Sequence, residues 1–311
     1  MRLLLIVNPS ASSVTPRTQV LIQRELGKAH DVELAETTRR GHATRLAEDA
    51  AHRGLDAAVV LGGDGTLNEA ANGLAHTDTA LIALPGGSTN VFARSIGLPD
   101  DPLEATMAMV QALANRDPGD AGEPIGTSIG LGQANDRWFL FHAGIGFDAA
   151  VVEQVERNSD LKRYISHPLF IYAALKTWFL HYDRKQPHFV AYAGDGQRID
   201  DGYFGIALNT NPYTYLGSAP LNLSDRAGLD EALVLLTVQS LRSANLAKLI
   251  GQAFTRGGVT SGKGLSVLED VRSLTIESER PFPWQLDGDF LGRTTRLELG
   301  WEPDVLRLLQ P

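Results

Sequence analysis

The sequence predicts two domains of different class: an α/β domain over residues 1–123 and a mostly antiparallel β sandwich over residues 124–311. In the first third, short apolar runs alternate with helical patterns, which indicates a parallel sheet with helices on both faces. The stretch Asn115–Pro124 is rich in glycine, proline and charge and is predicted to be a linker. Beyond it short alternating strands prevail, as in antiparallel sheets. We leave open whether the terminal strands return to the first domain.

Four segments of the first domain are predicted to be strands. They are Leu3–Val7, Asp31–Glu36, Ala57–Leu61 and Ala80–Leu84. Helices are expected between them, and the first begins at Thr15-Pro16, with proline at the first helical position, and runs to about Ala29. The others cover His42–His52, the stretch ending at Leu74, and the residues after Asn90.

The second domain is predicted from short runs of β-prone residues. Its expected strands are Ile125–Leu131, Trp138–His142, His188–Ala193, Phe204–Asn209, Leu233–Val238, Ser273–Glu277 and Thr295–Leu299. Three helical patterns interrupt them, at Ala149–Glu156, Tyr164–Tyr182 and Ser243–Phe254.

The composition is that of an ordinary globular protein, with 43% hydrophobic and 21% charged residues in 311. There is no cysteine, so disulfides and thiolate metal sites are excluded. The apolar run at Leu3 is too short for a signal peptide and no run reaches the ~20 residues of a membrane span, so we expect a cytoplasmic protein. A net charge of −9 disfavours bulk attraction to nucleic acid or to an anionic membrane, and leaves a local basic patch open.

Three polar or glycine-rich loops follow predicted strands of the parallel sheet. They are Asn8–Ser13, Gly62–Thr66 and Gly86–Asn90. The carboxyl ends of parallel strands lie at one edge of a sheet, where such folds bind their ligands. The three loops together therefore predict a phosphate site at that edge.

The loop Gly62-Gly63-Asp64-Gly65-Thr66 is the most informative of the three. Glycines let the backbone approach a bulky anion, and the following helix start offers N–H groups and a positive dipole end. A lone carboxylate would repel phosphate, so Asp64 indicates a bridging divalent cation or a substrate hydroxyl. The alternative is a strand-to-helix turn in which Asp64 is an N-cap.

Two other glycine motifs are weak signals. Gly144–Ala149 matches a dinucleotide fingerprint but lacks the acid about twenty residues later, so a tight strand-to-helix turn is favoured. Gly257–Gly264 nearly spells a phosphate loop, but it ends in glycine where Ser or Thr would bind magnesium, and we expect a flexible surface loop. The eight histidines show no metal-ligand spacing.

Near the C-terminus, Asp287-Gly288-Asp289 lies between apolar residues. Asp-Gly in that setting signals a β-hairpin turn. Two acids flanking a glycine could equally hold a metal or accept a proton. The pattern alone leaves both readings open.

Six segments together resemble the diacylglycerol kinase catalytic family, the bacterial lipid kinases related to sphingosine and ceramide kinases. They occur in the family's order and span nearly the whole chain. They are Asn8–Ser12, Thr38–Ala43, Gly62–Glu69, Pro85–Arg94, Ala143–Asp148 and Leu286–Asp289. The Gly62–Thr66 loop alone also occurs in NAD kinases.

The resemblance implies a Rossmann-like α/β nucleotide-binding domain, a β-sandwich lipid-binding domain, and ATP with Mg²⁺ bound in the cleft between them. It implies that Asp64 organises the catalytic Mg²⁺ and that Asn8 lines the nucleotide pocket. The full set of implied cofactor-binding residues is Asn8, Pro9, Ser10, Arg17, Thr38, Gly41, His42, Gly62, Gly63, Gly65, Thr66, Asn68, Glu69, Gly87, Ser88, Thr89 and Asn90.

The resemblance also implies a general base at Asp289, supported by Asp287. Family members usually carry glutamate at the position of Asp289, and many carry aspartate at that of Val91, so the chain departs from the pattern twice. A structural Mg²⁺ site is implied at Asp230 and Glu231, although the glycine of the family's turn is absent.

The implied activity is transfer of the γ-phosphoryl group of ATP to the primary hydroxyl of diacylglycerol or a sphingoid-type alcohol. The aromatic and basic stretch Tyr164–Leu180 is the expected lipid groove and a site of transient association with the inner membrane surface, or else an amphipathic helix packed on the sandwich. Competing hypotheses are a soluble-substrate kinase of the NAD kinase type and a catalytically silent binding module. A homodimer is left open.

Overall fold

The computed structural model describes residues 1–115, 123–157, 186, 188–255 and 257–311. These residues form two compact units, one of residues 1–130 with 303–311 and one of residues 131–302. The helix predicted over 164–182 lies outside the described residues. Among the described helices, none has the length and apolar character needed to cross a membrane.

The first unit is built on a parallel sheet. Its strands are β1 (Arg2–Val7), β2 (Asp31–Glu36), β3 (Ala57–Gly62) and β4 (Ala80–Pro85), in the order β4-β3-β1-β2. The pairings Val7↔Leu61 and Gly62↔Pro85 align the carboxyl ends of the three central strands. The predicted parallel α/β fold is therefore confirmed. The last residue of β16, Leu308, also pairs parallel with β4.

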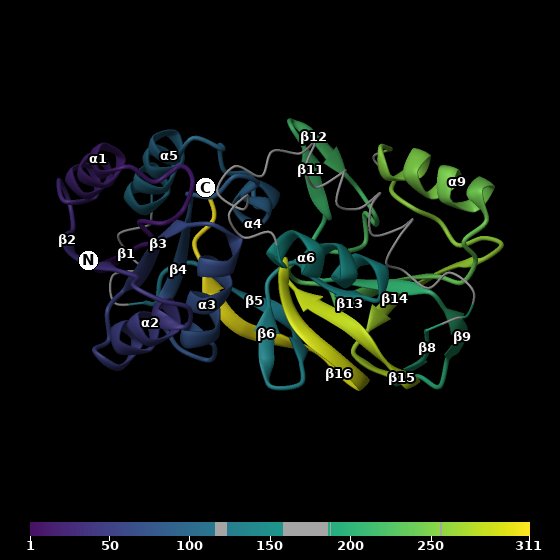
Figure 1. Cartoon of the computed structure of the whole chain (residues 1–311). Helices are drawn as coiled ribbons and strands as arrows, with labels where there is room; N and C mark the ends of the chain where they lie inside the picture. The colour runs from purple at the N-terminus through teal and green to yellow at the C-terminus, as the bar shows by residue number, and fades with distance from the viewer. Residues whose placement is uncertain (116–122, 158–185, 187, 256) are drawn as a thin grey trace. The chain divides into compact units, whose positions relative to one another are not determined.

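Five helices accompany this sheet. They are α1 (Pro16–Leu26), α2 (His42–His52), α3 (Asp64–Leu74), α4 (Val91–Ser95) and α5 (Pro102–Ala114). Figure 1 shows α1 and α5 over one face and α2 and α3 over the other. Thr15 and Asp101 cap α1 and α5 through side-chain oxygens, each before a proline. The α1 helix stops at Leu26, short of the predicted Ala29, because Gly27 follows as the C-cap.

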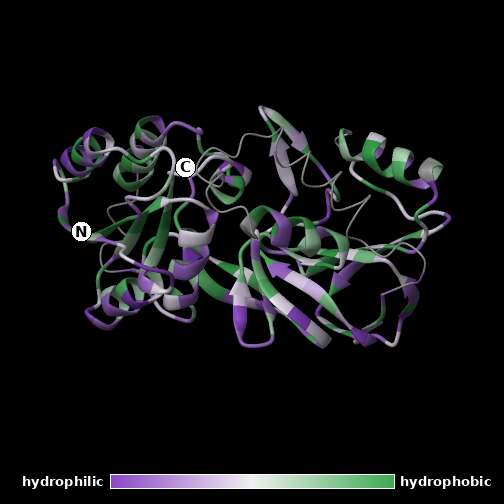
Figure 2. Ribbon diagram, viewed as in Figure 1, coloured by the Kyte–Doolittle hydropathy of each residue, from purple (hydrophilic) through white to green (hydrophobic). Residues whose placement is uncertain are grey.

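Every residue of β3 and β4 is buried, which is why both read as unbroken apolar runs in the sequence. Figure 2 shows these central strands in the hydrophobic colour. The edge strand β2 is partly exposed along its length. The rigid centre of the sheet therefore carries the loops that follow β1, β3 and β4.

The second unit is largely antiparallel. Its elements are β5 (Thr127–Ala134), which enters from the first unit, β6 (Arg137–Phe139), β7 (His142–Ile145), α6 (Phe147–Arg157), β8 (Phe189–Ala193), β9 (Arg198–Gly202), β10 (Phe204–Leu208), β11 (Thr214–Leu216), β12 (Ala219–Leu221), β13 (Leu233–Val238), α9 (Ser243–Ala253), β14 (Leu265–Val271), β15 (Ser273–Leu286) and β16 (Asp289–Leu308). Along the main sheet the order is β14-β13-β10-β7-β15-β16. The predicted antiparallel β region is confirmed.

Several strands of this unit differ from the predicted ones. The single strand expected over Trp138–His142 is two strands, β6 and β7, because the backbone of residues 140–142 donates to a side chain instead of to a neighbouring strand. The strands β9, β11, β12 and β14 were not predicted. Both β15 and β16 extend well beyond the predicted segments.

Side chains alternate between the two faces of a strand, and both faces of the antiparallel sheet in the second unit are apolar. On β10, Phe204, Ile206 and Leu208 belong to one buried cluster, whereas Ala207 belongs to the other. The cluster that contains Phe204 also includes Ala253 at the end of α9. The two faces therefore have separate cores, one of which is covered by α9.

Candidate functional site

The loops after β1, β3 and β4 meet at the carboxyl edge of the parallel sheet. The Asn8 amide donates to Thr66 Oγ1 over 2.9 Å, which joins the first loop to the start of α3. The Ser13 hydroxyl donates to the Gly87 carbonyl over 3.0 Å, which joins the first loop to the third. The structure thus brings together residues that lie up to about eighty positions apart in the chain.

Glycine is required where the second and third loops touch. A Cβ atom on Gly87 would lie 2.9 Å from the Gly63 Cα atom, and one on Gly86 would lie 2.8 Å from the Gly62 nitrogen. Such distances are too short for a real side chain, so the two backbones can pack only as glycines. The Asn90 side chain fixes the third loop because its Oδ1 atom accepts from the Gly87 N–H over 2.7 Å. The result is a backbone-lined surface beside a helix start.

Asp64 is the first residue of α3, and its N-cap is Gly63. Its two carboxylate oxygens accept from the Val91 and Phe92 N–H groups, each over 3.0 Å, so the side chain caps α4 instead of its own helix. The alternative in which Asp64 is the N-cap of the helix that it begins is therefore wrong, because Gly63 takes that position. Burial raises the pKa of the Asp64 carboxyl, while these two N–H donors act in the opposite direction.

The donor set around Asp64 fits a magnesium ion shared with phosphates. Mg²⁺ is commonly held by one or two carboxylates together with phosphate oxygens and water. The described residues contain no group of three or more acidic or histidine side chains that could hold a metal by themselves. Asp64 is half-buried at the edge of the glycine loops, where its carboxylate could share such an ion. A cation there would offset the cost of burying its charge.

Other expected cofactor residues have structural contacts. Glu69 accepts from the Gly41 and Ala43 N–H groups, over 2.8 and 3.2 Å, and so caps the N-terminus of α2. Asn68 has a fully buried side chain. In this conformation the Glu69 carboxylate caps α2 and the Asn68 side chain is buried, and a nucleotide-binding role for either residue stays a prediction. His42 Nδ1 accepts from the Thr38 N–H over 3.1 Å, which leaves Nε2 as the protonated nitrogen.

The remaining expected cofactor residues differ in exposure. Those at the loop surfaces are exposed or half-buried: Pro9, Ser10, Thr38, Gly41, Gly65, Ser88 and Thr89. Arg17 is exposed on the first turn of α1, and no contact joins it to the glycine loops. Asp100, which accepts from the Asn90 amide over 2.8 Å, was not predicted, because nothing in its sequence context marks it.

In the second unit, Asp287 and Gly288 form the turn between β15 and β16. Both have positive φ angles, +48° and +80°, as in a two-residue hairpin of type I′. The hairpin interpretation of Asp287-Gly288-Asp289 is therefore correct. The hairpin does not exclude a chemical role for the acids, because Asp287 and Asp289 have different surroundings.

Asp287 is buried and its carboxylate accepts three backbone N–H groups. Leu140 donates over 2.6 Å, Phe141 over 2.9 Å and His142 over 3.1 Å. Asp287 thus holds the connection between β6 and β7, and its carboxylate faces the protein backbone. Asp289, at the start of β16, is 17% exposed and lies 3.4 Å from the Arg137 guanidinium. Of the two acids, Asp289 is the one that solvent and a ligand can reach.

A buried polar cluster lies beside the turn. Gln285 accepts from the Gly288 N–H over 2.8 Å and donates to Asp148 over 2.6 Å. The Tyr213 hydroxyl donates to the other oxygen of Asp148. A Cβ atom at Gly144 would overlap the Asp148 carboxylate. The first glycine of the apparent dinucleotide fingerprint is therefore needed to admit a carboxylate, a role that was not predicted.

His142 belongs to the same region, with its ring centroid 4.7 Å from that of Tyr213. Burial lowers the pKa of His142 to about 4, and the nearby Asp148 charge only partly counters it. Its Nδ1 atom is buried and has no hydrogen-bond partner among the residues that the structure describes. The imidazole is therefore neutral at physiological pH.

Two further expectations concern residues of the second unit. Asp230 and Glu231 are exposed on the turn before β13, and the described residues place no third acidic or histidine ligand with them. Gly258 and Val259 in the loop after α9 are buried, and Val259 donates to the Leu223 carbonyl over 2.9 Å. The loop expected to be flexible is thus partly packed.

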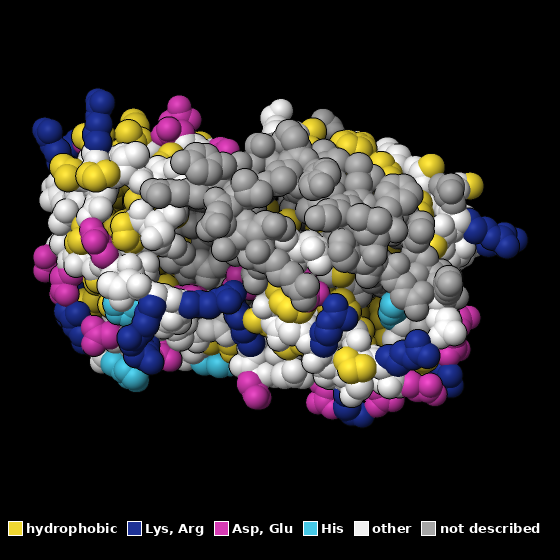
Figure 3. Space-filling view, in the orientation of Figure 1, with side chains coloured by type: hydrophobic (Ala, Val, Ile, Leu, Met, Phe, Trp, Pro, Cys, Tyr) yellow, Lys and Arg dark blue, Asp and Glu magenta, His cyan; other side chains and the backbone are white. Residues whose placement is uncertain are grey.

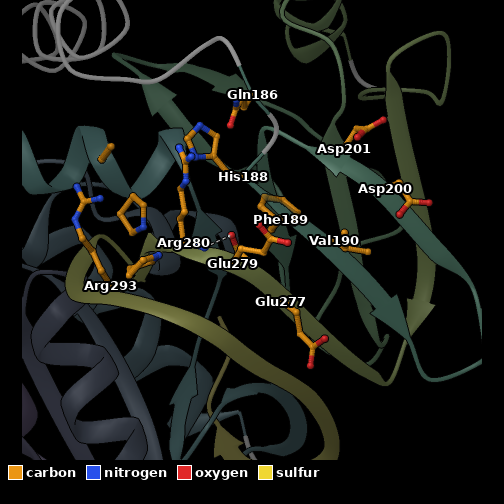
Figure 4. A pocket seen from close by; sticks show the side chains of 14 residues that line it. Gln186, His188, Phe189, Val190, Asp200, Asp201, Glu277, Glu279, Arg280 and Arg293 are labelled. Carbon is orange, nitrogen blue, oxygen red and sulfur yellow. Dashed lines mark hydrogen bonds between the residues drawn. The ribbon is translucent and has the colours of Figure 1, made fainter.

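A polar pocket of about 470 Å³ opens between β8, β9 and β15. Figure 4 shows its mixed lining, with Arg280, Arg293 and His188 on one side and Asp200 and Asp201 on the other. No predicted site residue lines it. A lining so rich in charge does not suit an acyl chain.

The glycine-lined helix start with its carboxylate is typical of proteins that bind nucleotide phosphates. Comparison with known proteins narrows this class to one family, because residues 2–120 match the diacylglycerol kinase catalytic domain. Residues 2–120 therefore form a domain of the diacylglycerol kinase catalytic family, and four of the six segments that indicated this family lie within them.

The relatives extend beyond the catalytic domain. A Chromohalobacter salexigens protein named "Probable lipid kinase YegS-like" is 29% identical over 297 residues, which span 92% of this chain and 86% of that protein. The Bacillus subtilis protein named "Diacylglycerol kinase" is 39% identical over 113 residues, 35% of this chain and 33% of that protein. Kinase family membership implies the use of ATP.

Solved structures agree on the fold. A diacylglycerol kinase from Bacillus anthracis matches all of this chain and 97% of its own, with a TM-score of 0.72 at 21% identity. An NAD kinase from Archaeoglobus fulgidus in complex with ATP matches with a TM-score of 0.52 at 12% identity, over 99% of this chain and 93% of its own. At these identities the likeness concerns the fold alone.

Proposed function

We propose that the protein is an ATP-dependent lipid kinase that phosphorylates the primary hydroxyl of diacylglycerol or a similar lipid alcohol, giving phosphatidic acid from diacylglycerol. The observation that carries the proposal is the contact of the Gly62–Gly63 and Gly86–Gly87 backbones beside Asp64. The names of the relatives support the lipid class of the substrate. We place its action at the cytoplasmic surface of a membrane, where such substrates lie.

The glycine loops would hold the phosphates of ATP through backbone N–H groups and the N-terminus of α3. Thr66, whose hydroxyl accepts from Asn8, and Thr89 would complete this surface. Asp64 would hold Mg²⁺ together with the phosphates, and the ion would neutralise charge on the transferred group. Val91 is compatible with this role, because it contacts Asp64 through its backbone and buries its side chain.

Asp289 would accept the proton of the lipid hydroxyl. The hydroxyl oxygen forms the new bond to the γ-phosphorus, the bond from that phosphorus to the β,γ-bridging oxygen breaks, and ADP leaves. Arg137 would orient Asp289, because its guanidinium donates to the carboxylate over 3.4 Å. Asp287 is a positioning residue, because its carboxylate is fully engaged by backbone donors and sets the path of the turn.

The test measures transfer from γ-labelled ATP to diacylglycerol, sphingosine, ceramide and NAD. We expect wild-type turnover on diacylglycerol and a loss of roughly 10²–10⁴-fold in kcat for Asp289→Ala. Nucleotide affinity, measured by calorimetry, should stay within about twofold. Asp195→Ala is the matched control, since Asp195 is also a turn carboxylate of the second unit and bonds only locally, to Gln197.

Turnover on NAD and none on any lipid would overturn the lipid assignment. Binding of ATP with no transfer to any acceptor would show a silent homologue. Wild-type turnover of Asp289→Ala would remove Asp289 as the base while leaving the substrate class intact.

A further inference from the structure

The helix α9 covers one apolar core of the second unit with only part of its surface. Leu246, Leu249 and Ala253 lie on the side that packs against the cluster containing Phe204. These residues recur at intervals of three and four, as expected for one helical face. The opposite face is therefore the one open to solvent.

That outer face is apolar. Ala244, Ala247, Ile250, Gly251 and Phe254 are all exposed, and they share one side of a helix with 3.6 residues per turn. The Ile250 side chain is 60% exposed and that of Phe254 is 51% exposed. The outer face of a surface helix is ordinarily polar, so this arrangement calls for a function. Figure 3 shows hydrophobic side chains at the surface over α9.

The charged residues in the stretch that contains α9 and its loop are of one sign. From Ala232 to Leu268 the sequence contains four basic and no acidic residues, although the whole chain has a net charge of −9. Lys248 and Lys263 are exposed, and a Cβ atom on Gly262 would lie 3.4 Å from Lys248 Nζ, so helix and loop form one surface.

The loop is fixed to the helix, because the Gln252 amide donates to Thr260 Oγ1 over 3.0 Å. The neighbouring turn adds Asp225 and Arg226, and Arg226 lies 3.9 Å from Glu269 of β14, so these three residues add one negative charge beside the four basic residues. The helix and loop therefore present a defined basic and apolar surface.

We propose that α9 and the loop after it, through Ile250, Phe254, Lys248 and Lys263, dock the protein on an anionic phospholipid surface. Apolar side chains beside lysines suit the boundary between headgroups and acyl chains. The excess of positive charge complements anionic lipid, so this surface should prefer anionic lipid to a neutral partner. The inference deepens the proposed function, since a kinase acting on a membrane lipid must reach the bilayer.

The test is sedimentation of the full-length protein with vesicles of 30% phosphatidylglycerol in phosphatidylcholine, and with phosphatidylcholine alone. We expect binding to the anionic vesicles that weakens at high salt. Lys248→Gln/Lys263→Gln should lower the partition coefficient about 25-fold, since each basic residue near such a surface contributes about 1 kcal/mol, or about fivefold. Ile250→Ser/Phe254→Ser should lower it at least about tenfold.

Matched controls come from the first unit. Val20→Ser/Met107→Ser removes two side chains that are 63% and 66% exposed there, and Arg24→Gln/Lys28→Gln removes one charge in the last turn of α1 and one just after the helix. Both variants should bind as the wild type does. Ile250→Leu/Phe254→Leu should retain binding, which separates lost apolarity from a disturbed helix.

The proposal would be overturned if Ile250→Ser/Phe254→Ser bound anionic vesicles within twofold of the wild type. It would also be overturned if the wild type did not bind anionic vesicles. A dimer in light scattering that this variant dissociates would assign the face to a second copy of the chain instead. With a water-soluble short-chain diacylglycerol, the docking variants should turn over normally. If the wild type sediments but phosphorylates no lipid, the docking surface stands and the proposed function fails.

Discussion

Replacing Asp287 should destabilise the second unit, whereas replacing Asp289 should leave its stability nearly unchanged. The change of choice is Asp287→Asn, because Asn tolerates the φ angle of +48° and therefore adds no backbone strain. The amide retains one acceptor oxygen and loses the charge. The experiment thus isolates the three hydrogen bonds made by the Asp287 carboxylate.

The magnitude follows from those bonds. Three buried N–H groups, from Leu140, Phe141 and His142, share the two Asp287 oxygens. A buried donor left without a partner costs about 1–3 kcal/mol. Asn can serve two of the three at most, which leaves one donor without a partner, so we expect the free energy of unfolding to fall by about 1–3 kcal/mol. Asp289→Asn loses one partly exposed ion pair with Arg137, which is worth at most about 1 kcal/mol.

Tryptophan fluorescence in urea is the assay, because all four tryptophans lie between residues 131 and 302 and report on the second unit. The unfolding midpoint and slope give the free energy for each variant. If Asp287→Asn were as stable as the wild type within about 0.5 kcal/mol, the role assigned to these hydrogen bonds would be wrong. A larger loss for Asp289→Asn than for Asp287→Asn would reverse the two assignments.

Three further predictions test other contacts. Gly87→Ala should weaken ATP binding at least tenfold by calorimetry, since its Cβ would press on Gly63; unchanged affinity would contradict the close packing. Glu69→Ala removes the cap on α2, so it should lower the free energy of unfolding by about 1–2 kcal/mol in thermal unfolding and leave ATP affinity unchanged. Weakened ATP binding would instead show that Glu69 contributes to the nucleotide site. The pKa of His142 is about 4 folded and about 6.5 unfolded, so protonation of the unfolded chain should remove up to about 3 kcal/mol of stability as pH falls from 6.5 to 4. His142→Phe should weaken this pH dependence of the free energy of unfolding, measured by urea titrations at several pH values. An unchanged pH dependence would assign the effect to another group.

The sequence predicted the first unit well because its signals are local. Fully buried strands such as β3 appear as unbroken apolar runs, and each is followed by glycine or proline at the site edge. The second unit was harder, since its short strands are defined by their partners. The strand β9, with Arg198, Asp200 and Asp201 among its five residues, has no β-forming pattern and is held by its pairing with β8.

The candidate site shows the same division between local and long-range signals. The glycine loops were predictable because backbone approach demands glycine at particular positions. The partner of each polar side chain was not, because it depends on contacts far apart in the chain. Asp64 caps α4, Glu69 caps α2, and Asp100 supports Asn90, and no spacing in the sequence encodes these pairings.

The turn at Asp287 explains how one short motif can supply both structure and chemistry. In a two-residue hairpin, the turn residues and the first residue of the next strand point in different directions. Asp287 turns inward to meet the backbone between β6 and β7, and Asp289, at the start of β16, remains partly exposed beside Arg137. Because the inward carboxylate fixes the turn, it also fixes where the outward one lies. An aspartate at position 289, shorter by one methylene than the usual glutamate, therefore depends more on Asp287 for its reach.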